Sequence, residues 1–322
     1  MKDLWACKVL VTPTSYAKND PTLRTTLEAA VGEVIYNTTG RPLNAQDLMP
    51  LVKDIDGYIA GLDAITLGVI NAAPELKVIA RYGVGVDAVD LNAAQQRGII
   101  VTNTPGANSA SVAELAVGLM LSLVRNIPQA VNATQSGEWP RLRGALLSGK
   151  TIGLYGFGSI GKIVAGLLSG FDCLIIAHDP YPDRESAKQL GVDLVEEDEL
   201  LTRSDVLSLH CPVLPETEGM VNDIFLHKMK PGAVLINTSR GELVDENALR
   251  QALSSSHLKG AALDVFRQQP PPAEHPLLSC PQVIATPHMG AHTDEATNAM
   301  GWGALNNCLA VLRGEDPENR II

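Results

Sequence analysis

The chain has 322 residues, 45% of them hydrophobic and only 4% aromatic, and its 25 lysines and arginines face 36 aspartates and glutamates. This length suits two domains better than one. The net charge of −11, with no basic patch in the sequence, argues against a protein that binds nucleic acid or anionic membranes. We therefore expect an ordered, aliphatic-rich α/β protein that binds a small molecule.

The first residues of the chain and the distribution of its cysteines indicate the cellular compartment of the protein. An apolar segment begins at Lys8 without the longer hydrophobic region and cleavage site of a secretory signal. The five cysteines are odd in number, widely spaced and never arranged as C-x-x-C, which argues against a disulfide framework and a zinc site. We expect a cytoplasmic protein with buried free thiols and no metal.

Short apolar runs alternate with helix-compatible segments in the first hundred residues, as in a parallel sheet. These runs cover residues 8–13, 33–37, 57–61, 77–83 and 98–103. A long helical pattern follows over residues 109–127, which we expect to link two domains. Its most apolar part, 111–124, is shorter than the ~18 residues of a membrane span.

The alternation restarts at Lys150 with six further strand-like runs, enough for a complete doubly wound sheet. They cover residues 151–158, 173–179, 206–212, 233–239, 260–266 and 282–288. A last helical pattern over residues 294–312 has no strand beside it. We expect this helix to return to the first domain.

The first run of the second group ends in a G-x-G-x-x-G motif made by Gly156, Gly158 and Gly161. Alone, the motif is weak, because any glycine-rich turn can match it. Here it follows a strand and opens a helix, so its amides can face a pyrophosphate with the helix dipole behind them. The context predicts a dinucleotide-binding turn.

Asp179 ends the next run, 18 residues after Gly161. A carboxylate at this place can accept hydrogen bonds from both ribose hydroxyls of an adenosine and would repel a 2′-phosphate. This favours NAD over NADP, with Arg184 as the nearest cation that could weaken the preference. The simpler alternative is that Asp179 only shapes the turn ahead of Pro180.

Polar side chains stand at or near the ends of three later runs, and these are Arg240, Asp264 and His288. Each has an ordinary explanation: an ion pair of Arg240 with Glu242 or Asp245, a turn cap, and a hydrogen-bonded core histidine. Because ligands bind beyond the carboxyl ends of the strands in such sheets, the three together predict one binding cleft.

At this point the sequence resembles the D-isomer-specific 2-hydroxyacid dehydrogenase family, nearest to its phosphoglycerate-dehydrogenase-like members. The resemblance covers nearly the whole chain and rests on several segments in the family's order. These segments are ARYGVGVDAVDL, NTPGANSASVAE, GKTIGLYGFGSIGK, HCPVLPET, LINTSRGELVDENAL, AALDVF and ATPHMGAHT.

The resemblance implies a fold and an assembly. A doubly wound parallel-sheet NAD-binding domain, residues 103–289, would be inserted into a smaller flavodoxin-like α/β substrate domain made of residues 1–102 and 290–322. It also implies a homodimer joined through the helix after Asn108. The implied activity is the NAD-dependent interconversion of a 2-hydroxy acid, usually of D configuration, and its 2-oxo acid.

It also implies roles for the polar strand ends. Arg240 would bind the carboxylate and carbonyl of the 2-oxo acid through its planar guanidinium, and His288 would exchange a proton with the substrate. The backbone amides of Val84 and Gly85 would bind the other carboxylate oxygen, and Asn108 would lie near the hinge and the substrate.

Further residues are implied to bind the cofactor. Ser159 and Ile160 would offer their amides to the pyrophosphate, and Asp264 would contact the carboxamide side of the cofactor. The complete implied cofactor set is Gly156, Gly158, Ser159, Ile160, Gly161, Asp179, His210, Pro212, Thr238, Ser239, Asp264 and Gly290.

The sequence departs from the family pattern beside the histidine. Most members carry a glutamate five residues beyond the strand-end aspartate, and this chain has Gln269 there. A carboxylate raises the pKa of a neighbouring histidine by about 1–3 units, whereas an amide only orients the ring. Our hypothesis is that Gln269 fixes the tautomer of His288 but leaves it mostly neutral near pH 7, which favours oxidation of an alcohol.

Other functions stay open. A histidine–glutamine pair also resembles the formate dehydrogenase branch of the superfamily, and an NAD-binding interaction protein with little turnover is a third possibility. Gln269 could also be a plain loop residue before prolines.

The substrate's tail is uncertain as well. Phosphoglycerate-specific members present an arginine shortly after the strand that ends near Ala60, where this chain has Leu62 and Asp63. A phosphate would meet a negative charge there and no partner. Arg81, Arg141 and Arg143 could supply positive charge, although surface positions suit them better.

Overall fold

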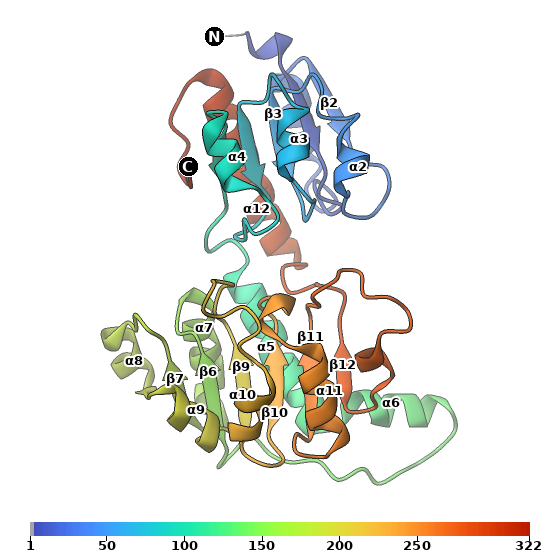
Figure 1. Cartoon of the computed structure of the whole chain (residues 1–322), viewed down its shortest axis with the longest axis vertical. Coiled ribbons are helices and arrows are strands. Elements are labelled where there is room, and N and C mark those ends of the chain that lie inside the picture. Colours follow the sequence, from blue (N-terminus) through green and yellow to red (C-terminus); the bar gives the residue numbers. More distant parts are fainter. Residues whose placement is uncertain (1–2) are drawn as a thin grey trace. The chain divides into compact units, whose positions relative to one another are not determined.

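The computed structural model describes residues 3–322 and divides the chain into two compact units. The first unit consists of the described residues up to Asn108 together with Ala291–Ile322, and the second is Ser109–Gly290. The divisions follow residues 108 and 290, where the sequence had suggested 102 and 289. Figure 1 shows each unit as a sheet with helices packed around it.

The first unit contains a five-stranded parallel sheet with the order β2-β1-β3-β4-β5, the flavodoxin-like order. Its strands are β1 (Lys8–Val11), β2 (Glu33–Tyr36), β3 (Gly57–Ala60), β4 (Val78–Arg81) and β5 (Ile100–Thr102). Its helices are η1 (Leu4–Ala6), α1 (Thr22–Ala30), α2 (Ala45–Leu48), α3 (Leu67–Asn71), α4 (Leu91–Gln96) and α12 (Asp294–Arg313). The last helix, α12, packs against β3 and β4 of this unit.

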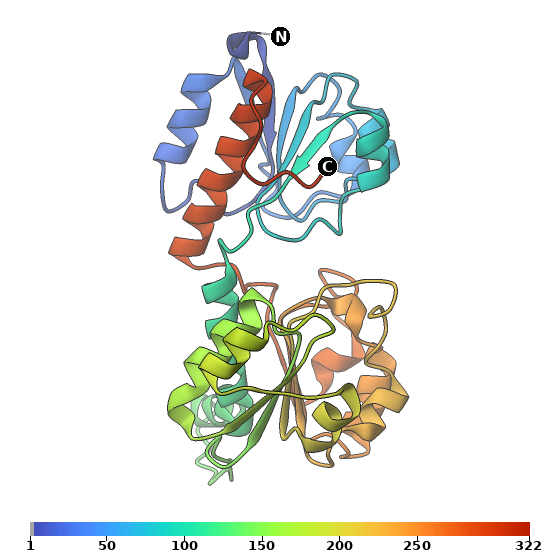
Figure 2. The ribbon, with the colours of Figure 1, turned by 90° about the vertical axis from the view of Figure 1, so that its left-hand side faces the viewer.

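Apolar side chains on alternate positions of β1 enter two separate cores. Val9 and Val11 pack with α1 and α12, whereas Leu10 packs with α2, α3 and α4 on the other face. Figure 2 shows α1 and α12 together on one face of this sheet. The period of two follows from strand geometry, and burial of both faces explains the continuous apolar runs in the sequence.

The second unit contains a seven-stranded parallel sheet with the order β12-β11-β10-β9-β6-β7-β8. Its strands are β6 (Thr151–Tyr155), β7 (Leu174–His178), β8 (Asp193–Leu194), β9 (Val206–Leu209), β10 (Val234–Asn237), β11 (Gly260–Leu263) and β12 (Val283–Ala285). Its helices are α5 (Ser109–Val124), α6 (Ile127–Gln135), α7 (Ser159–Leu168), η2 (Ser169–Phe171), α8 (Arg184–Leu190), α9 (Glu197–Arg203), α10 (Asp223–Lys228), η3 (Gly241–Leu243), α11 (Glu246–Ser254) and η4 (Pro276–Ser279).

The strand order reverses between β6 and β9, because β7 and β8 lie on one side of β6 and the later strands on the other. Such a switch point at the carboxyl ends of parallel strands is where doubly wound sheets bind ligands. The six strands predicted from the sequence are present, and the two-residue β8 is an addition. Both units thus have the predicted doubly wound and flavodoxin-like architectures.

Among the described residues, no single helix is long and apolar enough to cross a membrane. The pair α5 and α6 meets the length and composition test together, but a bend of 64° separates the two helices.

Candidate active site

The glycine turn after β6 is shaped by close backbone approaches. Gly156 has a φ of +100°, and a Cβ at this residue would lie 2.7 Å from the carbonyl carbon of His210. A Cβ at Gly161 would lie 2.5 Å from the carbonyl oxygen of Gly156. Only glycine fits at either position, because the backbones of the turn, of helix α7 and of the residues after β9 meet there.

Gly158 differs from its two partners, because a Cβ there would meet nothing within 4 Å. Gly158 is the N-cap of α7, and no side chain caps this helix. The amides of the first helical turn therefore face an open side of the turn, with the positive end of the helix dipole behind them. This cradle fits a pyrophosphate.

The carboxylate of Asp179 joins the ends of β6 and β7. Its Oδ2 accepts a hydrogen bond from the amide of Phe157 at 2.8 Å, and its Oδ1 accepts one from the amide of Tyr181, also at 2.8 Å. Asp179 therefore does shape its own turn. A carboxylate has about four acceptor positions, so this fixed group retains capacity for ribose hydroxyls.

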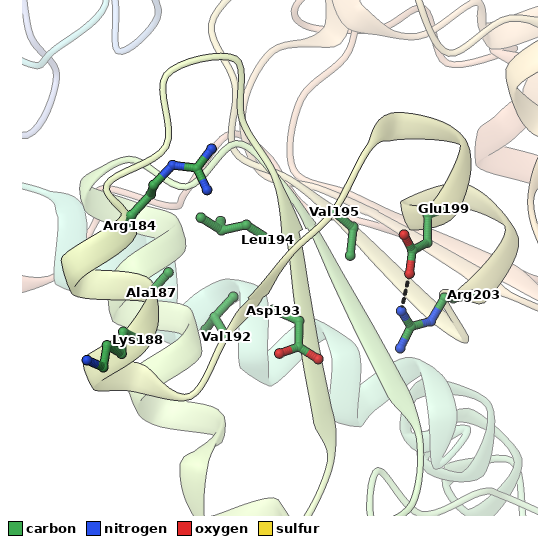
Figure 3. A pocket seen from close by; sticks show the side chains of 9 residues that line it. All are labelled: Arg184, Ala187, Lys188, Val192, Asp193, Leu194, Val195, Glu199 and Arg203. Carbon is green, nitrogen blue, oxygen red and sulfur yellow. Dashed lines mark hydrogen bonds and ion pairs between the residues drawn. The ribbon is translucent and has the colours of Figure 1, made fainter.

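Arg184 is the first residue of α8. With Lys188 and Arg203 it lines an open hollow on the side of β8, which Figure 3 shows together with the ion pair of Arg203 and Glu199. Opposite charges are mixed in this hollow, and Arg184 is the sole residue lining it that bears on the cofactor prediction. We do not regard the hollow as the functional site.

Buried polar atoms at the ends of β9 and β10 are left without partners. Neither ring nitrogen of His210 has a hydrogen-bond partner among residues 3–322, and the same holds for the hydroxyl of Thr238. Burial lowers the pKa of His210 to about 4, so its ring is neutral at pH 7. Because unpaired buried polar atoms are costly, these groups suit contacts with a bound ligand.

Arg240 follows β10 in a segment that is tightly packed. Its Nη1 donates to the carbonyl of Ser239 at 2.8 Å, and its own carbonyl accepts from Asn237 at 2.8 Å. A Cβ at the next residue, Gly241, would lie 2.0 Å from the carbonyl carbon of Phe266. The chain after β10 therefore packs directly against the chain after β11.

Asp264 holds the turn that carries His288. Its buried carboxylate accepts hydrogen bonds from the Thr286 hydroxyl at 2.6 Å and from the amides of Met289 at 2.9 Å and Gly290 at 2.8 Å. The amide of His288 donates to the Asp264 carbonyl at 2.9 Å. His288 adopts a φ of +51°, an uncommon conformation that these contacts impose. The predicted contact of Asp264 with a cofactor carboxamide stays a prediction.

Gln269 and His288 are hydrogen-bonded through Oε1 and Nδ1, which lie 2.6 Å apart. The amide nitrogen of Gln269 donates to the Phe266 carbonyl at 3.0 Å, so the amide oxygen is the atom that faces the ring. An oxygen acceptor requires a hydrogen on Nδ1. In the neutral imidazole, Nε2 is consequently the proton-accepting atom.

The loop that carries Gln269 has an anchor that the sequence analysis missed. One carboxylate oxygen of Glu246 accepts from the Arg267 amide at 3.0 Å, and the other lies 3.2 Å from Nε2 of His275. Glu246 sits at the start of α11, some 20 residues before this loop, and no sequence spacing signals the contact.

In the first unit, the turn at Val84 and Gly85 is fixed by its carbonyl groups. Asn103 donates to the Val84 carbonyl at 2.8 Å, and Nε of Arg81 donates to the Gly85 carbonyl at 3.0 Å. Arg81 is only 3% exposed and also donates to the Ala60 carbonyl at 2.9 Å, so the surface position expected for it is wrong.

Three further residues of this unit, Asp63, Leu62 and Asn108, differ in their burial. Asp63 is fully buried and bound by the amides of Leu43 and Gly61, so it is not the exposed negative charge that the sequence suggested. Its neighbour Leu62 is 49% exposed. Asn108, predicted near the hinge, has a buried Oδ1 with no partner among the described residues.

No group of three or more His, Cys, Asp or Glu side chains within residues 3–322 is arranged to hold a metal ion. The uncapped α7, the open side of Gly158, the fixed Asp179 and the unpartnered atoms of His210 and Thr238 instead fit a dinucleotide. They all lie at the carboxyl edge of the second sheet, next to its switch point.

Comparisons with known proteins agree with this geometry. Residues 117–290 match the family model described as the NAD-binding domain of D-isomer specific 2-hydroxyacid dehydrogenases. The chain is 44% identical to a D-3-phosphoglycerate dehydrogenase of Methanocaldococcus jannaschii over 90% of its own length, but it covers only 56% of that relative. It thus spans about half the length of the phosphoglycerate dehydrogenases that it matches.

Relatives of similar length also match. A glyoxylate reductase of Thermofilum pendens is 40% identical, with 88% of this chain and 86% of that protein covered. The crystal structure of an NAD-dependent formate dehydrogenase from Staphylococcus aureus with NAD is 32% identical and superimposes with a TM-score of 0.88, covering 98% of this chain and 99% of the other. The chain belongs to the D-isomer specific 2-hydroxyacid dehydrogenase family.

Proposed function

We propose that this protein is an NAD-dependent oxidoreductase that interconverts a 2-hydroxy acid of D configuration and its 2-oxo acid. One observation carries the proposal. The hydrogen bond between Gln269 and His288 presents an imidazole Nε2 as a proton acceptor, on a turn held by Asp264, in the unit that matches the NAD-binding domain of the family.

In this proposal His288 handles the substrate proton. When the alcohol is oxidised, its hydroxyl proton passes to Nε2 while Nδ1 keeps its hydrogen bond to Gln269. In the reverse direction, the protonated Nε2 donates to the carbonyl oxygen as it becomes a hydroxyl. NAD, when bound, accepts or returns the hydride of the substrate carbon.

Arg240 binds the substrate's carboxylate and carbonyl oxygen with its guanidinium, which orients the carbonyl toward the proton donor. The amides of Val84 and Gly85 bind the remaining carboxylate oxygen, and Asn108 lies near the hinge and the substrate. The fixed carbonyls of the 84–85 turn support this role, because they hold the turn in one conformation.

The glycine turn, Ser159 and Ile160 hold the pyrophosphate, and Asp179 binds the adenosine ribose and selects NAD over NADP. Contacts from His210, Pro212, Thr238, Ser239 and Gly290 complete the cofactor site. The open side of Gly158 and the unpartnered atoms of His210 and Thr238 support this assignment.

The test is NADH oxidation measured by absorbance across a panel of glyoxylate, hydroxypyruvate, phosphohydroxypyruvate and longer 2-oxo acids. Arg240→Ala should lower kcat/KM on the best substrate by about 10²- to 10³-fold, because it removes a charge-assisted bidentate contact. Arg250→Ala, an exposed position on α11, is the matched control. Equal activity of the two variants would contradict the proposal.

A formate-type reaction is the second candidate, because the Gln269–His288 pair and a formate dehydrogenase neighbour both point to it. In that reaction no proton needs to be exchanged at the histidine. Incubation with formate and NAD separates the two functions. Our proposal expects no NADH formation from formate, whereas turnover with formate alone would favour the second candidate.

We also propose a homodimer in the cytoplasm. Apolar side chains are exposed along α6 and the segment after it, with Trp139 78% exposed, and such a surface suits burial against a second copy. These side chains are Ile127, Val131, Trp139, Leu142 and Leu146. The five free cysteines suit a reducing compartment. Analytical ultracentrifugation should find twice the chain's mass of 34.2 kDa, and a monomer would contradict the assembly.

A further inference from the structure

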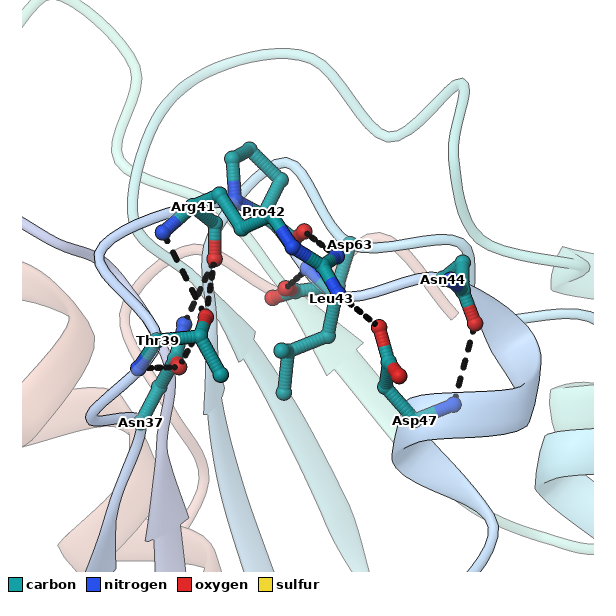
Figure 4. Close-up of polar contacts among 8 residues, drawn as sticks. All are labelled: Asn37, Thr39, Arg41, Pro42, Leu43, Asn44, Asp47 and Asp63. Atoms are coloured by element: carbon teal, nitrogen blue, oxygen red, sulfur yellow. Dashed lines mark hydrogen bonds and ion pairs between the residues drawn. The ribbon is translucent and has the colours of Figure 1, made fainter.

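The loop between β2 and α2, residues 37–43, is held rigidly at the carboxyl edge of the first sheet, as Figure 4 shows. The Asn37 amide nitrogen donates to the carbonyls of Thr12 at 3.2 Å and Arg41 at 2.8 Å. The Asn37 oxygen accepts from the amide and hydroxyl of Thr39. One side chain thus fixes both the start and the tip of the loop.

The far end of the loop is anchored by the buried Asp63. Its Oδ1 accepts from the Leu43 amide at 2.7 Å, and its Oδ2 accepts from the Gly61 amide and from the Thr12 hydroxyl. The loop is therefore tied to the ends of both β1 and β3. Through Ala60, whose carbonyl is bound by Arg81, it is connected to the turn at Gly85.

Arg41, on this loop, is paired with Asp47 on the following helix, α2. Nη2 of Arg41 lies 2.9 Å from Oδ2 of Asp47, while the two side chains remain 55% and 33% exposed. A second nitrogen, Nη1, donates to the Pro42 carbonyl at 3.1 Å. A guanidinium has five N–H groups, so Arg41 keeps donors for a ligand. Oδ2 of Asp47 is buried, so Oδ1 is the acceptor that this carboxylate offers.

The side chains near the ends of β3 and β4 differ in exposure. Leu62 and Val84 are exposed and apolar, Asp63 points inward, and Arg81 is buried. The positive charge of Arg41 is already balanced by Asp47. An anionic group would gain the attraction of one and the repulsion of the other, whereas a hydroxyl group can accept from Arg41 and donate to Asp47 at once.

We propose that Arg41 and Asp47 form a specificity pair that binds hydroxyl groups on the tail of the substrate. The substrate class is 2-oxo acids, and the matching 2-hydroxy acids, whose tails are uncharged and hydroxylated, with the carbon chain passing over Leu62. This inference rests on the proposed function and names the kind of substrate that it acts on.

The experiment compares kcat/KM for 2-oxogluconate, 2-oxohexanoate, 2-oxoglutarate and glyoxylate, with NADH as reductant. The wild-type protein should prefer the hydroxylated tail over the apolar and anionic tails. Arg41→Met should lower the ratio of kcat/KM for 2-oxogluconate to that for glyoxylate by about 10- to 100-fold. Because both values come from one preparation, the fraction of folded protein cancels in the ratio.

Asp47→Asn separates the hydroxylated tail from an anionic one. We expect the same ratio to fall by about tenfold, since one acceptor is lost. A rise of the 2-oxoglutarate activity in this variant would instead show that the pair meets an anion, and would overturn the proposal. Lys18→Met removes another exposed cation, in the segment after β1, and is the matched control.

The outcomes distinguish the two proposals. If the wild-type protein reduces none of these four acids and also none of hydroxypyruvate, phosphohydroxypyruvate and the longer 2-oxo acids, the proposed function fails. The wild-type protein could reduce glyoxylate while Arg41→Met, like Lys18→Met, leaves the ratio of kcat/KM for 2-oxogluconate to that for glyoxylate unchanged. In that case the specificity pair is wrong and the proposed function stands.

Discussion

The carboxyl edges of the two sheets differ in how their polar groups are used. At the second sheet, the ring of His210 and the hydroxyl of Thr238 have no partners among the described residues, and Gly158 leaves open space. At the first sheet, the charged groups nearest the strand ends, Asp63 and Arg81, are buried and bound to the backbone.

This difference indicates how the work of binding is divided. At the second edge, the unpartnered atoms of His210 and Thr238 are available to bind a cofactor. At the first edge, the buried charges of Asp63 and Arg81 instead fix loops and turns. Variants at the two edges should therefore change different observables.

The largest effect should come from His288→Asn. Asparagine tolerates the left-handed φ of this position but cannot exchange a proton near pH 7, so kcat should fall by about 10²- to 10⁴-fold. NAD affinity, measured by fluorescence titration, should change little. A parallel loss of NAD binding would mean that the substitution disturbs the whole edge.

At the first edge, Asp63→Ala should act on stability. The amides of Leu43 and Gly61 would lose their acceptor in a buried site, at a cost of about 2–4 kcal/mol in the free energy of unfolding. Denaturant unfolding measures the stability, and a separate NAD titration measures the affinity for the cofactor. If Asp63→Ala keeps the wild-type stability but binds NAD more weakly, the proposed difference between the two edges is wrong.

At the second edge, Gly158→Val should weaken NAD binding and leave the stability of the fold unchanged. The side chain meets open space, so the fold should persist, but it fills the cradle and should weaken NAD binding by about 10- to 100-fold. Gly161→Val is the contrasting variant, because its Cβ would lie 2.5 Å from the Gly156 carbonyl oxygen and should destabilise the turn itself. Unchanged NAD affinity in Gly158→Val would place the cofactor elsewhere.

The smallest change in rate, but the most specific, should come from Gln269→Glu. A carboxylate beside Nδ1 raises the pKa of His288, so more of the proton-donating form is present at a given pH. The pH above which ketone reduction declines should move upward by about 1–3 units. The hypothesis about Gln269 is wrong if this limb does not move in steady-state pH profiles.

Local patterns predicted most of the fold and the cofactor turn. Strand runs, the glycine spacing and Asp179 each depend on residues close together in the chain, so their geometry follows from the order of residues. The pairing of Gln269 with His288, across 19 residues, was suggested only by family resemblance.

The positions of Asp63, Glu246 and Arg81 depend on tertiary contacts that the spacing of residues in the sequence does not predict. The inward position of Asp63 arises because a loop two strands away offers the Leu43 amide. Glu246 supports the Gln269 loop from another helix. Arg81 looks like a surface cation in the sequence, but in the fold two backbone carbonyls bind it in the interior.

A crystal structure with NAD and oxalate, an inert mimic of a 2-oxo acid, would test the central claim most directly. We expect the dinucleotide on the Gly158 turn, and oxalate within about 2.7–3.2 Å of both the Arg240 guanidinium and Nε2 of His288. Side chains of these two residues turned away from the oxalate, or a dinucleotide bound at another place, would contradict the account.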